Sequence, residues 1–379
     1  MPTFEKFIEA RRLVICDANA EPTLVGLLEE FETINAGTLK FYRRHGGPMA
    51  LRLIVVDKWG FNAFAASLDD CDVIGINRGV YGILLATARG VVSQGFSTSQ
   101  FAGNQSDVAG RTVSGSPKDV LRGIAALDPS PLQDDSQDLT AHRIARVAFH
   151  FMLFHELAHL VNGHCDWVGL NRAVSLICEM NDGQFEALEG LERETLEWDA
   201  DSEAIREILE ITLQPHIGGV GGRATWSVPE RNSFGTPQDA FKFVGAAISI
   251  CSAYFGAFDD NDFLSNAPRT HPHPVLRMLS FRGATVQNLA FRCGMTYDEA
   301  SRFTSPFLEP MRQLNAFFTR DPSVSPPSDI IEIKNARTRQ YQHHWAKLHP
   351  ELDRLKRGGM LAPAQPVAHP AFPTTKVLG

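Results

Sequence analysis

The chain lacks paired cysteines, an excess of basic residues and a recognisable secretion signal. Its six cysteines are scattered over 379 residues with no CxxC pair, so we expect neither a disulfide framework nor a thiolate zinc site. The net charge of −8 argues against nucleic acid or an anionic membrane as the main partner. The N-terminal stretch MPTFEKFIEARRL contains acidic residues and no long apolar run, unlike a secretory signal. We therefore expect a cytoplasmic protein.

One apolar run tests that expectation. The run FVGAAISICSAYFGAF, at 243–258, is apolar for 16 residues and is flanked by Lys242 and Asp259. A membrane-spanning helix needs about 20 such residues. The glycine, alanine and serine in this run favour a closely packed core helix, so no stable membrane insertion is expected.

The composition and the hydrophobic patterns indicate an α+β protein. A hydrophobic content of 44% and a charged content of 21% are ordinary for a soluble chain. Short β-type runs at 51–57 and 71–77 predict a small sheet. Helical patterns predict that most of the remaining regular structure is helical; they cover 5–33, 80–92, 140–162, 184–213 and about 335–347.

Two low-complexity stretches divide the chain. A Gly/Ser/Gln/Asn-rich stretch at 96–118 reads as a loop, and the sequence turns Pro-rich after 321. Ser116 and Pro117 are typical of a helix start. These features predict an N-terminal α/β portion at 1–118, a central domain at 119–320 and a C-terminal extension at 321–379.

The stretch FHFMLFHELAHLVNGHCDW, 149–167, places a glutamate between two histidines in an otherwise apolar helix. Burying that polarity is costly unless something satisfies it. His155 and His159 lie on one helix face at i, i+4, and two imidazoles so spaced can bind one Zn²⁺. Glu156 can then take a proton from a metal-activated water. The alternative is a chance HExxH string, so a third ligand is needed.

Two residues are candidates for that ligand. His164 misses by one the third histidine of the metzincin motif, where this chain has Cys165; a histidine that caps or packs beneath the helix end is the favoured interpretation. Glu197 lies 38 residues after His159 on an amphipathic helix and can supply a carboxylate oxygen. Asp201, one turn on, can accept the N–H of a ligand histidine. The alternative is a solvated acidic face.

A third motif, NAPRTHPHPVLRML, follows the apolar run. Prolines on both sides of His273 stiffen this loop. A donor on such a loop, such as His271, can stabilise the oxyanion of a tetrahedral intermediate. The alternative is a proline-punctuated turn that leads into a helix.

These three motifs, HELAH at 155–159, EWDADSEA at 197–204 and THPHPVLR at 270–277, together resemble those of gluzincin peptidases of the HtpX and CAAX-prenyl-protease type. The resemblance implies a mostly helical, zincin-like catalytic domain with a small sheet whose edge strand binds extended substrate by β-augmentation. It implies these site residues: zinc ligands His155, His159 and Glu197, general base Glu156, His155 partner Asp201, transition-state donor His271, and Arg277 locking the loop or pairing with a site carboxylate.

The layout also looks like that of the soluble phage-exclusion peptidases of the Lit type, which cleave a host translation factor inside the cell. The resemblance implies a zinc-dependent endopeptidase acting on a cytoplasmic protein, with residues 1–118 as a substrate exosite. One alternative is a soluble housekeeping or quality-control peptidase for unfolded chains. Another is a zinc-binding regulator without proteolytic activity, which the intact Glu156 and His271 argue against.

Overall fold

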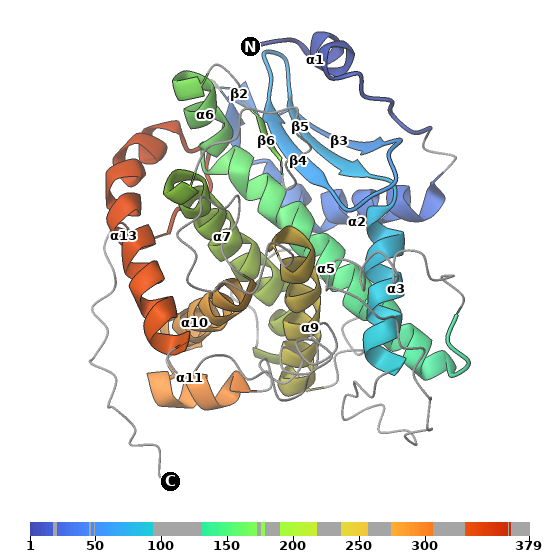
Figure 1. The fold of residues 1–379 in the computed structure, drawn as a ribbon, viewed down its shortest axis with the longest axis vertical. Helices are drawn as coiled ribbons and strands as arrows, with labels where there is room; N and C mark the ends of the chain where they lie inside the picture. Colours follow the sequence, from blue (N-terminus) through green and yellow to red (C-terminus); the bar gives the residue numbers. More distant parts are fainter. Residues whose placement is uncertain are drawn as a thin grey trace.

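The computed structural model places a small mixed sheet at one end of a group of packed helices (Figure 1). It describes residues 1–17, 21–44, 47–48, 50–93, 131–172, 176–178, 190–217, 236–256, 274–293, 295–305, 330–362 and 364. Within these ranges the architecture is mostly helical with a small sheet, as the α+β prediction requires.

The main sheet has the strand order β3-β5-β4-β6. Strand β3 is parallel to β5, whereas β4 is antiparallel to both of its neighbours, β5 and β6. A separate pair of two-residue strands, β1 and β2, is antiparallel. The strand bounds are β1 Arg43–Arg44, β2 Gly47–Pro48, β3 Leu51–Val56, β4 Ala63–Ser67, β5 Asp72–Asn77 and β6 Leu176–Cys178.

Ten helices are described, and they provide most of the core. Their bounds are α1 Phe4–Arg11, α2 Pro22–Leu39, α3 Val80–Ser93, α5 Asp135–Val161, α6 His164–Arg172, α7 Gly190–Ile217, α9 Pro237–Gly256, α10 Pro274–Cys293, α11 Tyr297–Phe303 and α13 Ile330–Leu355.

Both faces of the sheet are covered, which explains why every residue of β4 and β5 is buried. Side chains alternate between the faces of a strand. Ala65 and Ile74 belong to the core shared with the long helices, whereas Phe64 and Val73 pack with Phe7 of α1 in a second cluster. The sheet is therefore held between α1 on one side and the helices on the other.

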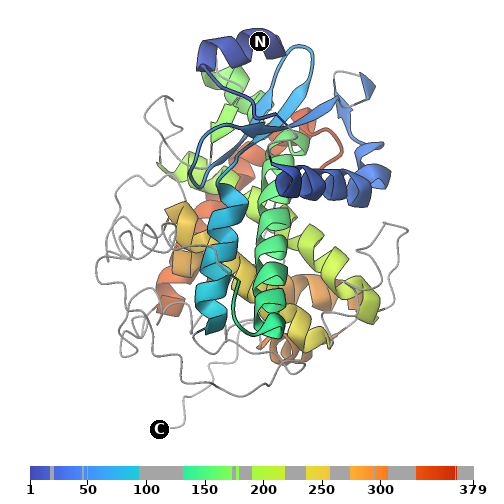
Figure 2. The ribbon, with the colours of Figure 1, turned by 90° about the vertical axis from the view of Figure 1, so that its right-hand side faces the viewer.

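Helix α5 runs lengthwise through the molecule, with α3 beside it (Figure 2). The Asp134 side chain caps its start by accepting hydrogen bonds from Ser136 N and Gln137 N. It ends at Asn162, followed by Gly163 at a φ of +80°, which a side chain would strain. Among the described residues α5 alone is long and apolar enough to cross a membrane, and 94% of that apolar window is buried inside the protein.

Several sequence predictions are confirmed. Strands β3 and β5 match the runs at 51–57 and 71–77, and α3 matches 80–92. The stop at Asn162 and Gly163 is also confirmed. In the apolar run at 243–258, the described side chains up to Ala253 are buried, so that part is a core helix.

Other predictions need correction. The single helix expected at 5–33 is wrong, because the chain leaves α1 and pairs Ile15 with Val56 of β3 before α2 begins. Helix α7 continues to Ile217, past the expected end at 213, and α13 is longer than 335–347; residues 184–189, the expected start of α7, lie outside the described residues. Strand β4 was not predicted, since AFAAS lacks the β-branched residues typical of strands.

The domain division stays a prediction. Both boundaries, at 118/119 and 320/321, lie outside the described residues, as do the 96–118 stretch and the helix start at Ser116. Side chains from all three predicted segments, such as Phe31, Phe154 and Trp345, nevertheless belong to one hydrophobic core.

Candidate metal centre

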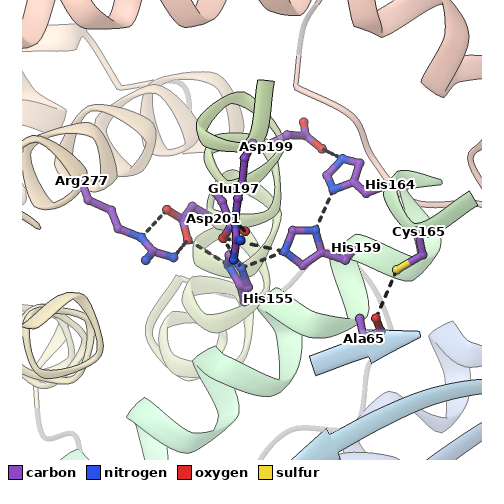
Figure 3. Close-up of polar contacts among 10 residues, drawn as sticks. Ala65, His155, His159, His164, Cys165, Glu197, Asp199, Asp201 and Arg277 are labelled. Atoms are coloured by element: carbon purple, nitrogen blue, oxygen red, sulfur yellow. Dashed lines mark hydrogen bonds and ion pairs between the residues drawn. The ribbon is translucent and has the colours of Figure 1, made fainter. Parts of the chain in front are cut away.

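Helices α5 and α7 pack against each other and bring together side chains that are far apart in sequence. His155 and His159 project from the last turns of α5, and Glu197 projects toward them from α7 (Figure 3). Each of the three exposes at most 1% of its surface. The predicted meeting of the two helices at these residues is present in the structure.

The three side chains fit a metal ion. His155 Nε2 lies 3.0 Å from His159 Nε2 and 3.1 Å from Glu197 Oε2, and His159 Nε2 lies 3.9 Å from the same oxygen. Two donors on a tetrahedral Zn²⁺ are separated by about 3.3 Å, given bond lengths near 2.0–2.1 Å, and the observed separations bracket that value. Two imidazoles and a carboxylate suit a divalent transition metal. The group can therefore hold a metal ion.

The outer nitrogen of His155 contacts a carboxylate. His155 Nδ1 lies 2.9 Å from Asp201 Oδ1. Arg277 donates hydrogen bonds to both oxygens of the same carboxylate, and its Nε lies 2.5 Å from Oδ2. This bidentate geometry makes such pairs strong. Arg277 is 2% exposed. Asp201 can thus orient His155, and Arg277 pairs with a carboxylate of the site.

The outer nitrogen of His159 contacts a second histidine. His159 Nδ1 lies 3.0 Å from His164 Nδ1, and His164 Nε2 lies 3.0 Å from Asp199 Oδ2 (Figure 3). His164 is therefore behind His159, on the side away from Glu197. In this arrangement it is not the third member of the metal-binding group, which agrees with the interpretation that it packs beneath the helix end.

Glu156 and Cys165 are both buried, and they are next in sequence to His155 and His164, respectively. Cys165 Sγ donates to Ala65 O of β4 at 3.5 Å. Burial and the neighbouring carboxylates of Asp166 and Glu156 raise the pKa of the Cys165 thiol. The cysteine at the metzincin third-ligand position therefore directs its Sγ to Ala65 O and is not one of the three members of the metal-binding group.

Two buried side chains at this site were not singled out from the sequence. Arg193 lies one turn before Glu197, with its Nε 3.8 Å from Glu197 Oε1, and Asp199 backs His164. The i, i+4 spacing of Arg193 and Glu197 is a signal that the sequence does carry. The sequence carries no such signal for Asp199, since this residue lies off the helix face that Glu197 and Asp201 share.

The third motif is described only in part. His271 lies outside the described residues, so its role as a transition-state donor stays a prediction. Arg277, at the motif's end, is placed in α10 against Asp201. The motif therefore contributes Arg277, which contacts Asp201, the carboxylate beside His155.

Comparison of the chain with protein-family models, with curated proteins and with solved structures finds no match. What can be said of its function therefore depends on the arrangement of its own residues.

Proposed function

We propose that this protein is a zinc-dependent endopeptidase of the gluzincin type, with His155, His159 and Glu197 as the zinc ligands. The observation that carries the proposal is the convergence of these three buried side chains from two helices; Glu156, also buried, is next to His155 in the sequence. Two histidines and a glutamate are the protein ligands of catalytic zinc in peptidases that keep the remaining position open. A purely structural zinc site would instead have four protein ligands.

The residues around the group match the tasks of peptide hydrolysis. Zinc, when bound, supplies a Lewis acid that lowers the pKa of a water and polarises a carbonyl. Glu156 would be the residue that accepts a proton from the attacking water and returns it to the departing amine when the C–N bond breaks. Asp201 holds His155 in place through its Nδ1. His271 would donate a hydrogen bond to the oxyanion.

The sheet offers a place for an extended substrate. Strand β6 pairs with β4 on one side, and it is the last strand in the order of the described sheet. Ala65 of β4, which pairs with Ile177 of β6, accepts a hydrogen bond from Cys165, just beyond the end of α5. The β6 side of the sheet is therefore near the end of the helix that carries the histidines. A substrate strand adding to such an edge would bind through its main chain, largely independently of its sequence.

The burial of the site favours a dedicated substrate over general digestion. Glu156 and the three ligands expose at most 1% of their surface, so a polypeptide reaches them only after surrounding residues move. An enzyme in this form stays inactive until a particular cytoplasmic target or signal opens it, as the likeness to phage-exclusion peptidases implies. Casein should then be cut slowly or not at all, whereas a housekeeping peptidase would cut it readily.

Metal content tests the proposal directly. Protein purified without a chelating tag should contain about one zinc per chain, measured by mass spectrometry, and Glu197→Ala should lose it. Glu192→Ala is a matched control, because Glu192 is in the first turn of the same helix and outside the group. No metal in the wild type, or equal metal in Glu197→Ala and the wild type, would rule out the His-His-Glu site.

A further inference from the structure

We propose that Asp199 and His164 form a relay that positions His159, keeping its Nε2 unprotonated and directed at the metal. The proposal rests on the metal site of the proposed function. It concerns the orientation and tautomer of one ligand and makes His164 and Asp199 positioning residues. Neither is one of the three members of the metal-binding group.

Asp199 is built to accept hydrogen bonds. It is fully buried, and its Oδ2 accepts from Asn162 Nδ2 at 2.7 Å and lies 3.0 Å from His164 Nε2. Its Oδ1 accepts from the main-chain N–H of Ala362 at 2.7 Å. Three groups from two segments, the turn from α5 into α6 and the C-terminal segment, therefore converge on one carboxylate, which as an ion can only accept.

The order of the protons follows from that restriction. Because Asp199 only accepts, His164 must carry its proton on Nε2, which leaves Nδ1 of the neutral ring as an acceptor. That acceptor lies 3.0 Å from His159 Nδ1, so His159 must carry its proton on Nδ1. The Nε2 of His159 then has a free lone pair, and it is the atom that faces His155 and Glu197.

The C-terminal segment after α13 completes the relay. Arg357 N and Gly359 N donate to Val161 O, the last residue of α5, at 2.7 Å and 3.2 Å. A Cβ at Gly359 would lie 1.9 Å from Asn162 Oδ1, so only glycine permits this approach. The segment then reaches Ala362, whose N–H bonds Asp199. A stretch 163 residues away in sequence thus holds the carboxylate in place.

Asp199→Asn tests the relay with almost no change in shape. The main-chain N–H of Ala362 would keep the amide oxygen at the Oδ1 position, so the new NH2 would face His164 Nε2 and Asn162. The Asn162 amide would then turn to accept, and the His164 proton would move to Nδ1. His159 would then have to accept at Nδ1 and carry its proton on Nε2, where it blocks the metal. We expect zinc affinity to fall by about 10–100-fold, the usual loss when such an outer partner is removed.

The tautomers can be read from the metal-free, full-length protein by ¹⁵N NMR of labelled histidines at about pH 8.5, where imidazoles are neutral. The wild type should show His159 protonated on Nδ1, and Asp199→Asn should show it protonated on Nε2. Glu194→Gln is the matched control, since Glu194 is a buried carboxylate on the same helix that pairs with Arg337 and Tyr341. It should leave the His159 tautomer and the zinc affinity unchanged.

A second pair of variants covers a failure of Asp199→Asn to fold. His164→Gln keeps an acceptor for His159 and a donor for Asp199 and should bind zinc nearly as the wild type does, whereas His164→Leu should bind about 10–100-fold more weakly. Equal zinc affinity in these two variants, or an unchanged His159 tautomer in Asp199→Asn, overturns the relay. If the wild type binds no zinc but the tautomers change as stated, the relay stands and the proposed function fails.

Discussion

Arg357 should be one of the most sensitive positions for the stability of this protein. Its side chain is 5% exposed and lies between two buried carboxylates. Its Nη1 is 2.6 Å from Asp72 Oδ1, at the start of β5, and its Nε is 2.7 Å from Asp166 Oδ2, in α6. Burial alone would lower the pKa of Arg357, but Asp72 and Asp166 outweigh it and raise the pKa. The arginine is therefore a charged link between the C-terminal segment, the sheet and α6.

Replacing Arg357 by alanine would leave two buried carboxylates without this cation. Breaking a buried ion pair by removing one partner costs about 3–5 kcal/mol. That is a large part of a total stability of about 5–15 kcal/mol. This loss of unfolding free energy reports the cost of leaving two carboxylates buried without their cation. That cost is larger than the stability that the intact ion pairs add relative to apolar side chains of the same size.

Urea unfolding of the full-length protein, followed by circular dichroism, measures this loss as a shift of the midpoint at constant slope. The control is Arg354→Ala, on the exposed surface near the end of α13, which should change the free energy of unfolding by less than about 0.5 kcal/mol. The variant Arg357→Met combined with Asp72→Asn and Asp166→Asn should recover part of the loss, because no buried charge is stranded. A loss below about 1 kcal/mol for Arg357→Ala, as an exposed ion pair would give, would refute the reasoning.

Further predictions concern the site and the acid stability. Glu156→Gln should keep its metal by mass spectrometry and lose peptidase activity; an active variant would remove Glu156 as the base. His271→Ala should lower kcat by about 10²–10³ with unchanged metal content, and loss of metal would show that His271 is structural or a ligand. Asp201→Ala should weaken zinc affinity by about 10–100-fold in a chelator competition, and unchanged affinity would mean that Asp201 does not orient His155. Burial raises the pKa of Glu30, but His150 and a neighbouring arginine outweigh it and lower the pKa. The stability from this pairing is present above the unfolded pKa of about 4.3 and is lost as the pH falls through the lower folded value. Glu30→Gln should therefore flatten the acid side of the stability profile, and an unaltered profile would count against the pairing.

Local features of the site could be predicted because they depend on helix geometry alone. His155 and His159 share a face because an α-helix repeats every 3.6 residues, whatever surrounds it. The end of that helix at Asn162 and Gly163 likewise follows from neighbouring residues. The strands β3 and β5 were evident from their runs of β-branched residues.

Contacts between residues that are far apart in the sequence could not be predicted from helix geometry and neighbouring residues alone. Glu197 reads as part of an acidic helix face, and only the packing of α7 on α5 turns it toward His155, 42 residues away. The pairing of His164 with Asp199 needs a turn, a helix and the C-terminal segment to meet at once.

The sequence by itself therefore determined the HExxH helix, its C-terminal end and the chemistry that its side chains favour, because these depend on contacts within one or two turns. The tertiary structure decided how Glu197, already expected from the motifs, meets the histidines, which nitrogens face it, and that Arg357 bonds Asp72, 285 residues away. Each of these depends on the burial of side chains between elements, and that burial is a property of the whole packed core rather than of any single stretch.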